Sequence, residues 1–185
     1  MLTELLAGLK ARQETLRYNC FKVLNLLVEN NGEVLYPHWN YFVALLGADN
    51  TYRKLSALQI IAGLTRVDAG HRFEAIFDRY YDLLDDRSMI VAAYIASNSG
   101  KIARAKPELE PRITDRLLSI DKTHHAPGRK ALVKAGAIEA FGEYFADAGS
   151  KPGIIEFVRR QLASESPKTR KLAGQFLKTQ AGYSL

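Results

Sequence analysis

Two groups of side chains in this sequence have the types that acid–base or metal chemistry uses. His124 and His125 are adjacent, and Asp82, Asp85 and Asp86 lie close together in a second segment. Carboxylates three residues apart are neighbours on a helix, which is the least that acid–base catalysis requires. Adjacent side chains on a helix or turn point apart, and no cysteine or carboxylate stands at a recognisable ligand spacing beside the histidine pair. We therefore expect no metal site and no cofactor, and we interpret the acidic group as a turn that caps the next helix.

A basic group in the second half of the chain is a candidate for binding phosphate. The net charge is +6 overall, but it is −1 over residues 1–95 and +7 over residues 96–185. Six basic residues lie at the starts of two expected helices, where N–H groups and the helix dipole already favour anions: Arg129, Lys130, Lys134, Lys168, Arg170 and Lys171. If the two helices stack side by side, the six residues form one basic strip, and nucleic acid becomes the alternative partner. No aromatic residue interleaves with the strip, so base stacking is not indicated.

An aromatic group is the candidate for binding a protein partner. Its members are Tyr36, Trp39, Tyr41, Tyr80 and Tyr81. Tyrosine and tryptophan are favoured anchors of protein interfaces. Helical spacing places part of this group in the core, and we expect the remainder to form an exposed patch.

The common sequence motifs of enzymes are absent. The chain has no glycine-rich phosphate loop, no G-x-S-x-G, no H-E-x-x-H and no paired C-x-x-C. The single cysteine, Cys20, lies on an apolar helical stripe, where we expect a buried and inert thiol. The first residues do not have the pattern of a signal peptide, and no apolar run approaches the ~18 residues that span a bilayer. We expect a cytoplasmic protein without a membrane partner.

The sequence predicts that the acidic, basic and aromatic groups are all positioned by helices. Apolar residues recur at helical spacing, and no sustained alternation of period two indicates a strand. The pattern predicts helices near residues 2–10, 12–30, 37–47, 51–66, 71–84, 88–99, 110–119, 127–147, 152–164 and 167–180. All six prolines fall at or before an expected helix start, where the missing N–H costs little. The segment Met89–Ala96 is apolar nearly all round, so we expect it to be buried in the middle of a stack.

Three junctions between these helices repeat one pattern, at residues 45–58, 83–94 and 162–173. Each ends a helix on leucine, turns through small or acidic residues, and opens a helix rich in alanine and leucine. The junctions resemble HEAT repeats of the armadillo-like helical superfamily, whose turn and inner-helix pattern is best met by Ser166, Pro167, Arg170, Ala173 and Leu177. Met89 departs from the pattern at its basic position.

The resemblance implies an all-α fold, a right-handed superhelix of about five HEAT-like helix pairs formed by residues 1–185 as a single domain. It also implies that Arg53 and Arg170 are structural residues that pair with neighbouring acidic side chains. We interpret the chain as a non-catalytic scaffold that binds a protein. A nucleic-acid-binding module that uses the basic strip is the alternative. A HEAT-like DNA glycosylase is a third reading, and it requires a concave pocket with an aspartate and aromatic side chains.

Overall fold

The computed structural model describes residues 1–180, and that part of the chain contains helices and no strand. The prediction of an all-α fold is confirmed. The chain divides into two compact units, an N-terminal unit of Met1–Tyr80 and a C-terminal unit that begins at Tyr81. A single domain over residues 1–185 stays a prediction, as does the superhelix.

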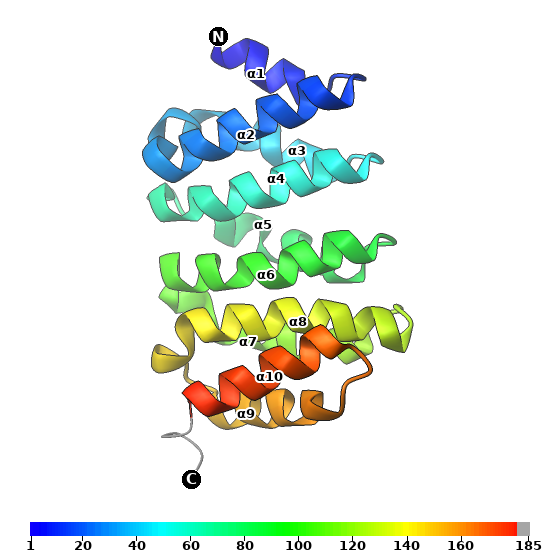
Figure 1. Cartoon of the computed structure of the whole chain (residues 1–185). Helices are drawn as coiled ribbons and strands as arrows, with labels where there is room; N and C mark the ends of the chain where they lie inside the picture. The colour runs from blue at the N-terminus through cyan, green and yellow to red at the C-terminus, as the bar shows by residue number, and fades with distance from the viewer. Residues whose placement is uncertain (181–185) are drawn as a thin grey trace. The chain divides into compact units, whose positions relative to one another are not determined.

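The N-terminal unit is built from helix pairs that share one core. Its helices are α1 (Leu2–Gly8), α2 (Glu14–Asn31), α3 (Trp39–Leu45), α4 (Thr51–Leu64) and α5 (Arg72–Tyr81). Helix α4 packs against α2 and α3, as Figure 1 shows. Helix α5 is tied to its neighbours by polar contacts: the Tyr80 hydroxyl donates to the Leu58 carbonyl at 3.3 Å, and the Arg79 guanidinium donates to the Val43 carbonyl at 3.1 Å. The predicted burial of Cys20 is confirmed.

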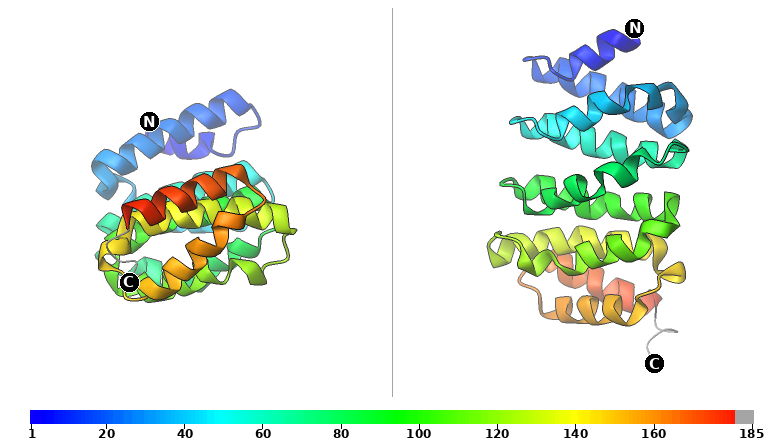
Figure 2. Two further views of the ribbon diagram at one scale, coloured as in Figure 1. Left: turned by 60° about the horizontal axis from the view of Figure 1, so that its bottom comes forward. Right: turned by 180° about the vertical axis from the view of Figure 1, so that it is seen from behind.

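The C-terminal unit has two layers. Its helices are α6 (Met89–Ala105), α7 (Glu110–Leu118), α8 (Pro127–Tyr144), α9 (Lys151–Arg160) and α10 (Pro167–Thr179). Helices α6, α8 and α10 run in the same direction and form one layer, while α7 and α9 lie behind them (Figures 1 and 2). Helix α8 contacts both α6 and α10, and this central position explains its many buried alanines.

Local sequence signals set the helix starts as expected. Asn50 caps α4 by accepting a hydrogen bond from the Arg53 amide at 3.1 Å, and Ser166 caps α10 by accepting one from the Thr169 amide at 3.3 Å. Proline occupies the first helical position of both α8 and α10. The sequence predicts the ends of the helices less accurately than their starts. The expected helix 88–99 stops too early, because α6 continues to Ala105.

The reason for the longer α6 is the position of the next proline. Gly100 stays helical, and the helix ends where Lys106 adopts φ −133° and ψ 70°. A residue that precedes proline is disfavoured in the helical region, because the proline ring clashes with its backbone. Pro107 therefore ends α6, and a short 3₁₀ turn, Pro107–Leu109, leads into α7.

Helix α8 is continuous through Gly136, and that glycine allows α6 to approach closely. A Cβ atom at Gly136 would lie 3.1 Å from the Ala93 carbonyl oxygen and 3.1 Å from the Ser97 nitrogen. Both atoms belong to the α6 backbone, which cannot turn aside as a long side chain can. The absence of a side chain at this one position thus sets the spacing between α6 and α8.

The prediction that Met89–Ala96 is buried all round is wrong on one side. Ile90 is 50% exposed and Tyr94 is 38% exposed, although Val91, Ala92 and Ile95 are fully buried. A helix in a two-layer stack has neighbours beside and behind it, and its remaining side faces solvent. No helix within residues 1–180 is both long and apolar enough to cross a bilayer.

Candidate functional site

Large apolar side chains are exposed together on one face of the C-terminal unit. Because Gly136 packs against Ala93 and Ser97, Leu132, one turn earlier on α8, lies level with Ile90 on α6. Leu132 is 41% exposed, and Tyr94 follows Ile90 one turn further along α6. We call Ile90, Tyr94 and Leu132 the α6–α8 face.

Two basic residues flank the α6–α8 face. Arg129 is exposed on α8, one turn before Leu132, and Lys101 is half-buried on the same side of α6 as Ile90 and Tyr94. Within the described residues neither side chain has a hydrogen-bond or ion-pair partner. The face therefore offers apolar contacts next to unpaired positive charge, a combination that suits a partner with both apolar and acidic side chains.

The expected aromatic patch does not form one exposed surface. Trp39, Tyr80 and Tyr81 are at most 1% exposed, so these three belong to the core. The Tyr81 hydroxyl is hydrogen-bonded to Ser99 at 3.1 Å inside the C-terminal unit, and burial raises the pKa of Tyr81 far above its usual value. The helical stripe could not separate core from surface here, because more than one side of each helix is covered.

The other two members of the group, Tyr36 and Tyr41, are partly exposed but hold the N-terminal unit together. The Tyr36 hydroxyl donates to the Asp68 carboxylate at 2.6 Å, and the Tyr41 hydroxyl donates to the Leu6 carbonyl. Burial is the main cause that raises the pKa of both phenols. Contact of either ring with a partner stays a prediction.

The basic strip is partly neutralised by the chain itself. Lys130 donates to the Asp121 carbonyl at 2.8 Å, and Lys134 lies 2.6 Å from the Asp121 carboxylate. These residues line an open hollow of about 300 Å³ at the start of α8. On α10, Lys168 lies 3.1 Å from the Glu139 carboxylate. Two of the six charges are therefore paired with carboxylates, which weakens the attraction for a polyanion.

Arg170 has the structural role that the repeat pattern implies, but its partners are carbonyl groups. Within residues 1–180 its guanidinium pairs with no carboxylate; it donates to the Ser164 carbonyl at 2.6 Å and to the Glu165 carbonyl at 3.1 Å, which closes the turn before α10. Arg53 donates in the same way to the Lys10 carbonyl at 2.8 Å. Expecting acidic partners was wrong because backbone carbonyls lie within reach, in the preceding turn for Arg170 and between α1 and α2 for Arg53. Arg129 and Lys171 are the members of the strip without a hydrogen-bond or ion-pair partner in the described part of the chain.

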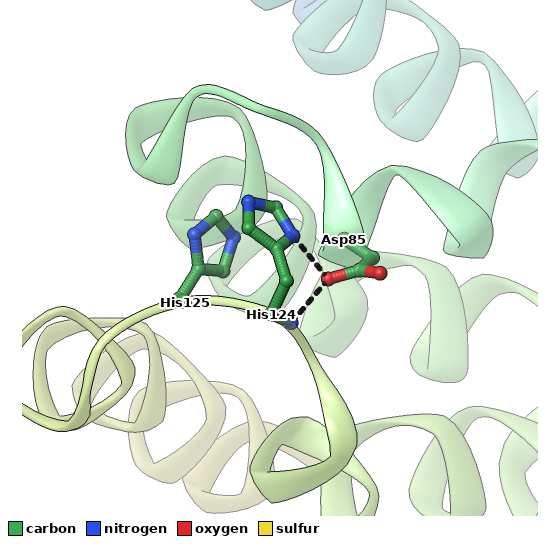
Figure 3. Close-up of side chains that lie close together, drawn as sticks. All are labelled: Asp85, His124 and His125. Carbon is green, nitrogen blue, oxygen red and sulfur yellow. Dashed lines mark hydrogen bonds and ion pairs between the residues drawn. The ribbon is translucent and has the colours of Figure 1, made fainter.

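The histidine pair and the acidic turn meet, although they are far apart in the sequence. The Asp85 carboxylate accepts hydrogen bonds from the His124 backbone amide at 2.7 Å and from its ring Nδ1 at 2.6 Å (Figure 3). The His124 and His125 rings lie 4.3 Å apart, tilted by 40°. Both reasons given against a metal site are therefore wrong: the rings do not point apart, and a carboxylate does lie beside them.

The number of residues between Asp85 and His124 is the sequence feature from which this cluster could have been predicted. Asp85 and His124 are 39 residues apart, and other contacts between successive repeats span 38 and 39 residues. Residues one repeat apart occupy equivalent positions in neighbouring helix pairs. An acidic residue and a histidine at that spacing can therefore meet although they are far apart in the sequence.

The cluster has unusual electrostatics. Hydrogen bonds from His124, first from its backbone and then from its ring, hold the pKa of Asp85 below its usual value. Burial lowers the pKa of His125, and the neighbouring His124 ring lowers it further. His125 is 4% exposed, and its Nε2 has no hydrogen-bond partner. The His125 ring is therefore uncharged at neutral pH.

Acidification is expected to destabilise the protein in part through His125. An unfolded histidine has a pKa of about 6.5, and burial lowers that of His125, so the unfolded state binds more protons below that pH. The contribution of the neutral His125 ring to the free energy of unfolding is fully present above pH ~6.5. It is lost as the pH falls toward the pKa of His125 in the folded state. Urea denaturation at pH ~7.5 and ~5.5 measures the loss. His125→Gln should reduce the difference between the two pH values, while His38→Gln should leave it unchanged; equal differences in the wild type and His125→Gln would contradict the prediction.

The remaining members of the acidic group are also engaged. Asp82 pairs with Arg116 at 3.0 Å, and Asp86 accepts from the Ser88 amide at 2.8 Å, which confirms the expected turn before α6. Asp82 and Asp85 line an open hollow of about 430 Å³. Its one aromatic lining residue, Tyr81, is buried, so no aromatic ring is exposed there for a base to stack on. The hollow lacks what the glycosylase reading requires.

Comparisons with known proteins give a similar solved structure but no matching family model. No family model matches it, and no curated protein matches it. Among solved structures, a designed armadillo repeat protein is similar with a TM-score of 0.49 and 14% sequence identity, over 96% of this chain and 99% of that chain. The all-α fold rests on the structure itself, and the HEAT type of repeat stays a prediction.

Proposed function

We propose that this chain is a non-catalytic module that binds a segment of a partner protein on the α6–α8 face. The observation that carries the proposal is the exposure of Ile90, Tyr94 and Leu132 at adjacent levels of two helices that pack closely in parallel. Burying apolar surface contributes about 25 cal/mol per Å², and exposed apolar groups that lie together commonly mark interaction sites.

The basic residues beside the α6–α8 face indicate that the partner segment carries acidic side chains. Arg129 and Lys101 flank the apolar side chains, and residues 96–185 carry a net charge of +7. A segment with leucine-like side chains and nearby carboxylates would place both kinds of group against complementary surface. Helices held rigidly by their neighbours need little reordering to bind it. A cytoplasmic location stays a prediction.

A library of short displayed peptides selected on the immobilised chain tests the proposal. We expect the selected peptides to combine large apolar residues with aspartate or glutamate. Leu132→Asp should weaken their binding by roughly tenfold or more, because it places a charge among apolar contacts. Leu162→Asp is the matched control, since Leu162 is 49% exposed and lies outside the α6–α8 face.

Two results would count against this function. One is peptide binding that Leu132→Asp leaves unchanged while circular dichroism shows both variants folded. The other is tight binding to duplex DNA that weakens steeply with salt and is lost in Arg129→Glu and Lys171→Glu, because that result favours the basic strip.

A further inference from the structure

Three potential metal ligands from two separate turns converge in the C-terminal unit. Asp85, His124 and His125 each offer one ligand atom, and these atoms lie within 4.8 Å of one another. Figure 3 shows the two imidazole rings and the carboxylate side by side, with Asp85 arriving from the turn before α6 and the histidines from the loop before α8. The cluster plays no part in the proposed protein-binding face.

The buried nitrogen of His125 is the second observation that points to a ligand. Its Nε2 is shielded from solvent and has no partner, and leaving a buried polar atom unsatisfied costs about 1–3 kcal/mol. A neutral imidazole with its proton on Nδ1 carries a lone pair on Nε2, and that is the form of histidine that binds a metal.

We propose that Asp85, His124 and His125 bind a divalent zinc-type ion. Zinc takes imidazole nitrogen at about 2.0–2.1 Å and carboxylate oxygen at about 2.0–2.2 Å, with three protein ligands leaving a fourth position for water. Tetrahedral ligands at those distances lie about 3.4 Å apart, so the Asp85–His124 pair, which is 2.6 Å apart, must widen and the more distant ligand atoms must move closer. Asp85 and His124 are 55% and 54% exposed and have room to do so.

Binding replaces a hydrogen bond with a metal bond. The proton on His124 Nδ1 moves through solvent to Nε2 of the same ring, so the ring stays neutral, and the ion takes the proton's place between Nδ1 and Asp85 while His125 Nε2 supplies the third bond. Two imidazoles favour zinc, nickel or copper over magnesium and calcium, which prefer oxygen ligands. Arg129 faces the cluster and opposes a cation, whereas the charge of Asp85 offsets it.

The ion would join the turn before α6 to the loop before α8. These two segments precede the helices that carry the α6–α8 face, and the hydrogen bonds between Asp85 and His124 already connect them. A metal bond would replace that exposed contact with a stronger one, so binding should raise the melting temperature.

Calorimetric titration with zinc chloride and NMR of the histidine rings test the proposal on the full chain. The chain has four histidines, which makes the ring signals assignable. We expect one zinc ion per chain, with shifts of the His124 and His125 signals and none of His38 or His71. Asp85→Asn and His125→Gln should each weaken binding about tenfold or more, and His71→Gln, which also removes one histidine, should not.

The alternative results are distinct. Absence of binding at ~100 μM zinc, or shifts at His38 or His71 instead, would overturn the proposal. The NMR titration of the unchanged protein decides the matter even if His125→Gln folds poorly. Binding should also fall with acidification, because both histidines must be deprotonated; zinc affinity that does not change between pH ~7.5 and ~5.5 would equally overturn it.

Discussion

Trp39→Ala is expected to lower the free energy of unfolding by about 3–5 kcal/mol, the usual cost of truncating a buried tryptophan. Trp39 is 1% exposed at the start of α3, and its indole contacts the Tyr36 ring with centroids 6.0 Å apart. The loss has two causes: the apolar surface no longer buried, and the cavity that rigid neighbouring helices cannot close. Urea denaturation measures this loss in the free energy of unfolding. Circular dichroism monitors the unfolding, because its signal does not depend on tryptophan and Trp39 is the single tryptophan of the chain.

Tyr18→Ala is the matched control for this substitution. Tyr18 is an aromatic residue of the same unit, but it is 57% exposed on α2, and its removal should cost less than about 1 kcal/mol. A small loss for Trp39→Ala would mean that the indole lies outside the core and would restore it as a binding residue. A large loss supports the conclusion that the aromatic group is mainly structural.

The helices could be predicted from the sequence because their signals are local. Capping residues such as Asn50 and Ser166 and prolines such as Pro127 and Pro167 act within one turn of the helix start. Their effect does not depend on the rest of the fold. The main error was at the end of α6, where the expected helix stopped at residue 99, whereas Pro107 sets the end.

The sites could be predicted only in part because they depend on packing between helices. Apolar spacing shows that a helix has buried sides but not which side stays open, so Tyr81 was expected at a surface and Ile90 in the core. The Asp85–His124 contact requires knowing how one repeat stacks on the next. Charge counts had a similar limit, since they gave the basic strip but not the carboxylate of Asp121 that compensates it.

Close packing of α6 and α8 connects the fold to the proposed function, and Gly136→Leu tests that connection. The first atom of the new side chain would lie 3.1 Å from two backbone atoms of α6, and the rest would need space that the interface does not have. We expect a loss of about 3 kcal/mol in the free energy of unfolding, the upper range for overpacking. Gly142→Leu, on the same helix, is the matched control, because a Cβ there meets nothing within 4 Å. It should be neutral or stabilise by up to about 1 kcal/mol through helix propensity alone.

The same pair of variants separates stability from binding. Leucine at position 136 must push α8 away from α6, which moves Leu132 away from Ile90 and divides the α6–α8 face. At a temperature where the Gly136→Leu protein is still folded, its affinity for the selected peptides should therefore fall, while Gly142→Leu should bind as the wild type does. Unchanged affinity in a folded but destabilised Gly136→Leu protein would show that binding does not depend on the spacing of the two helices, and the partner would then contact α6 or α8 alone.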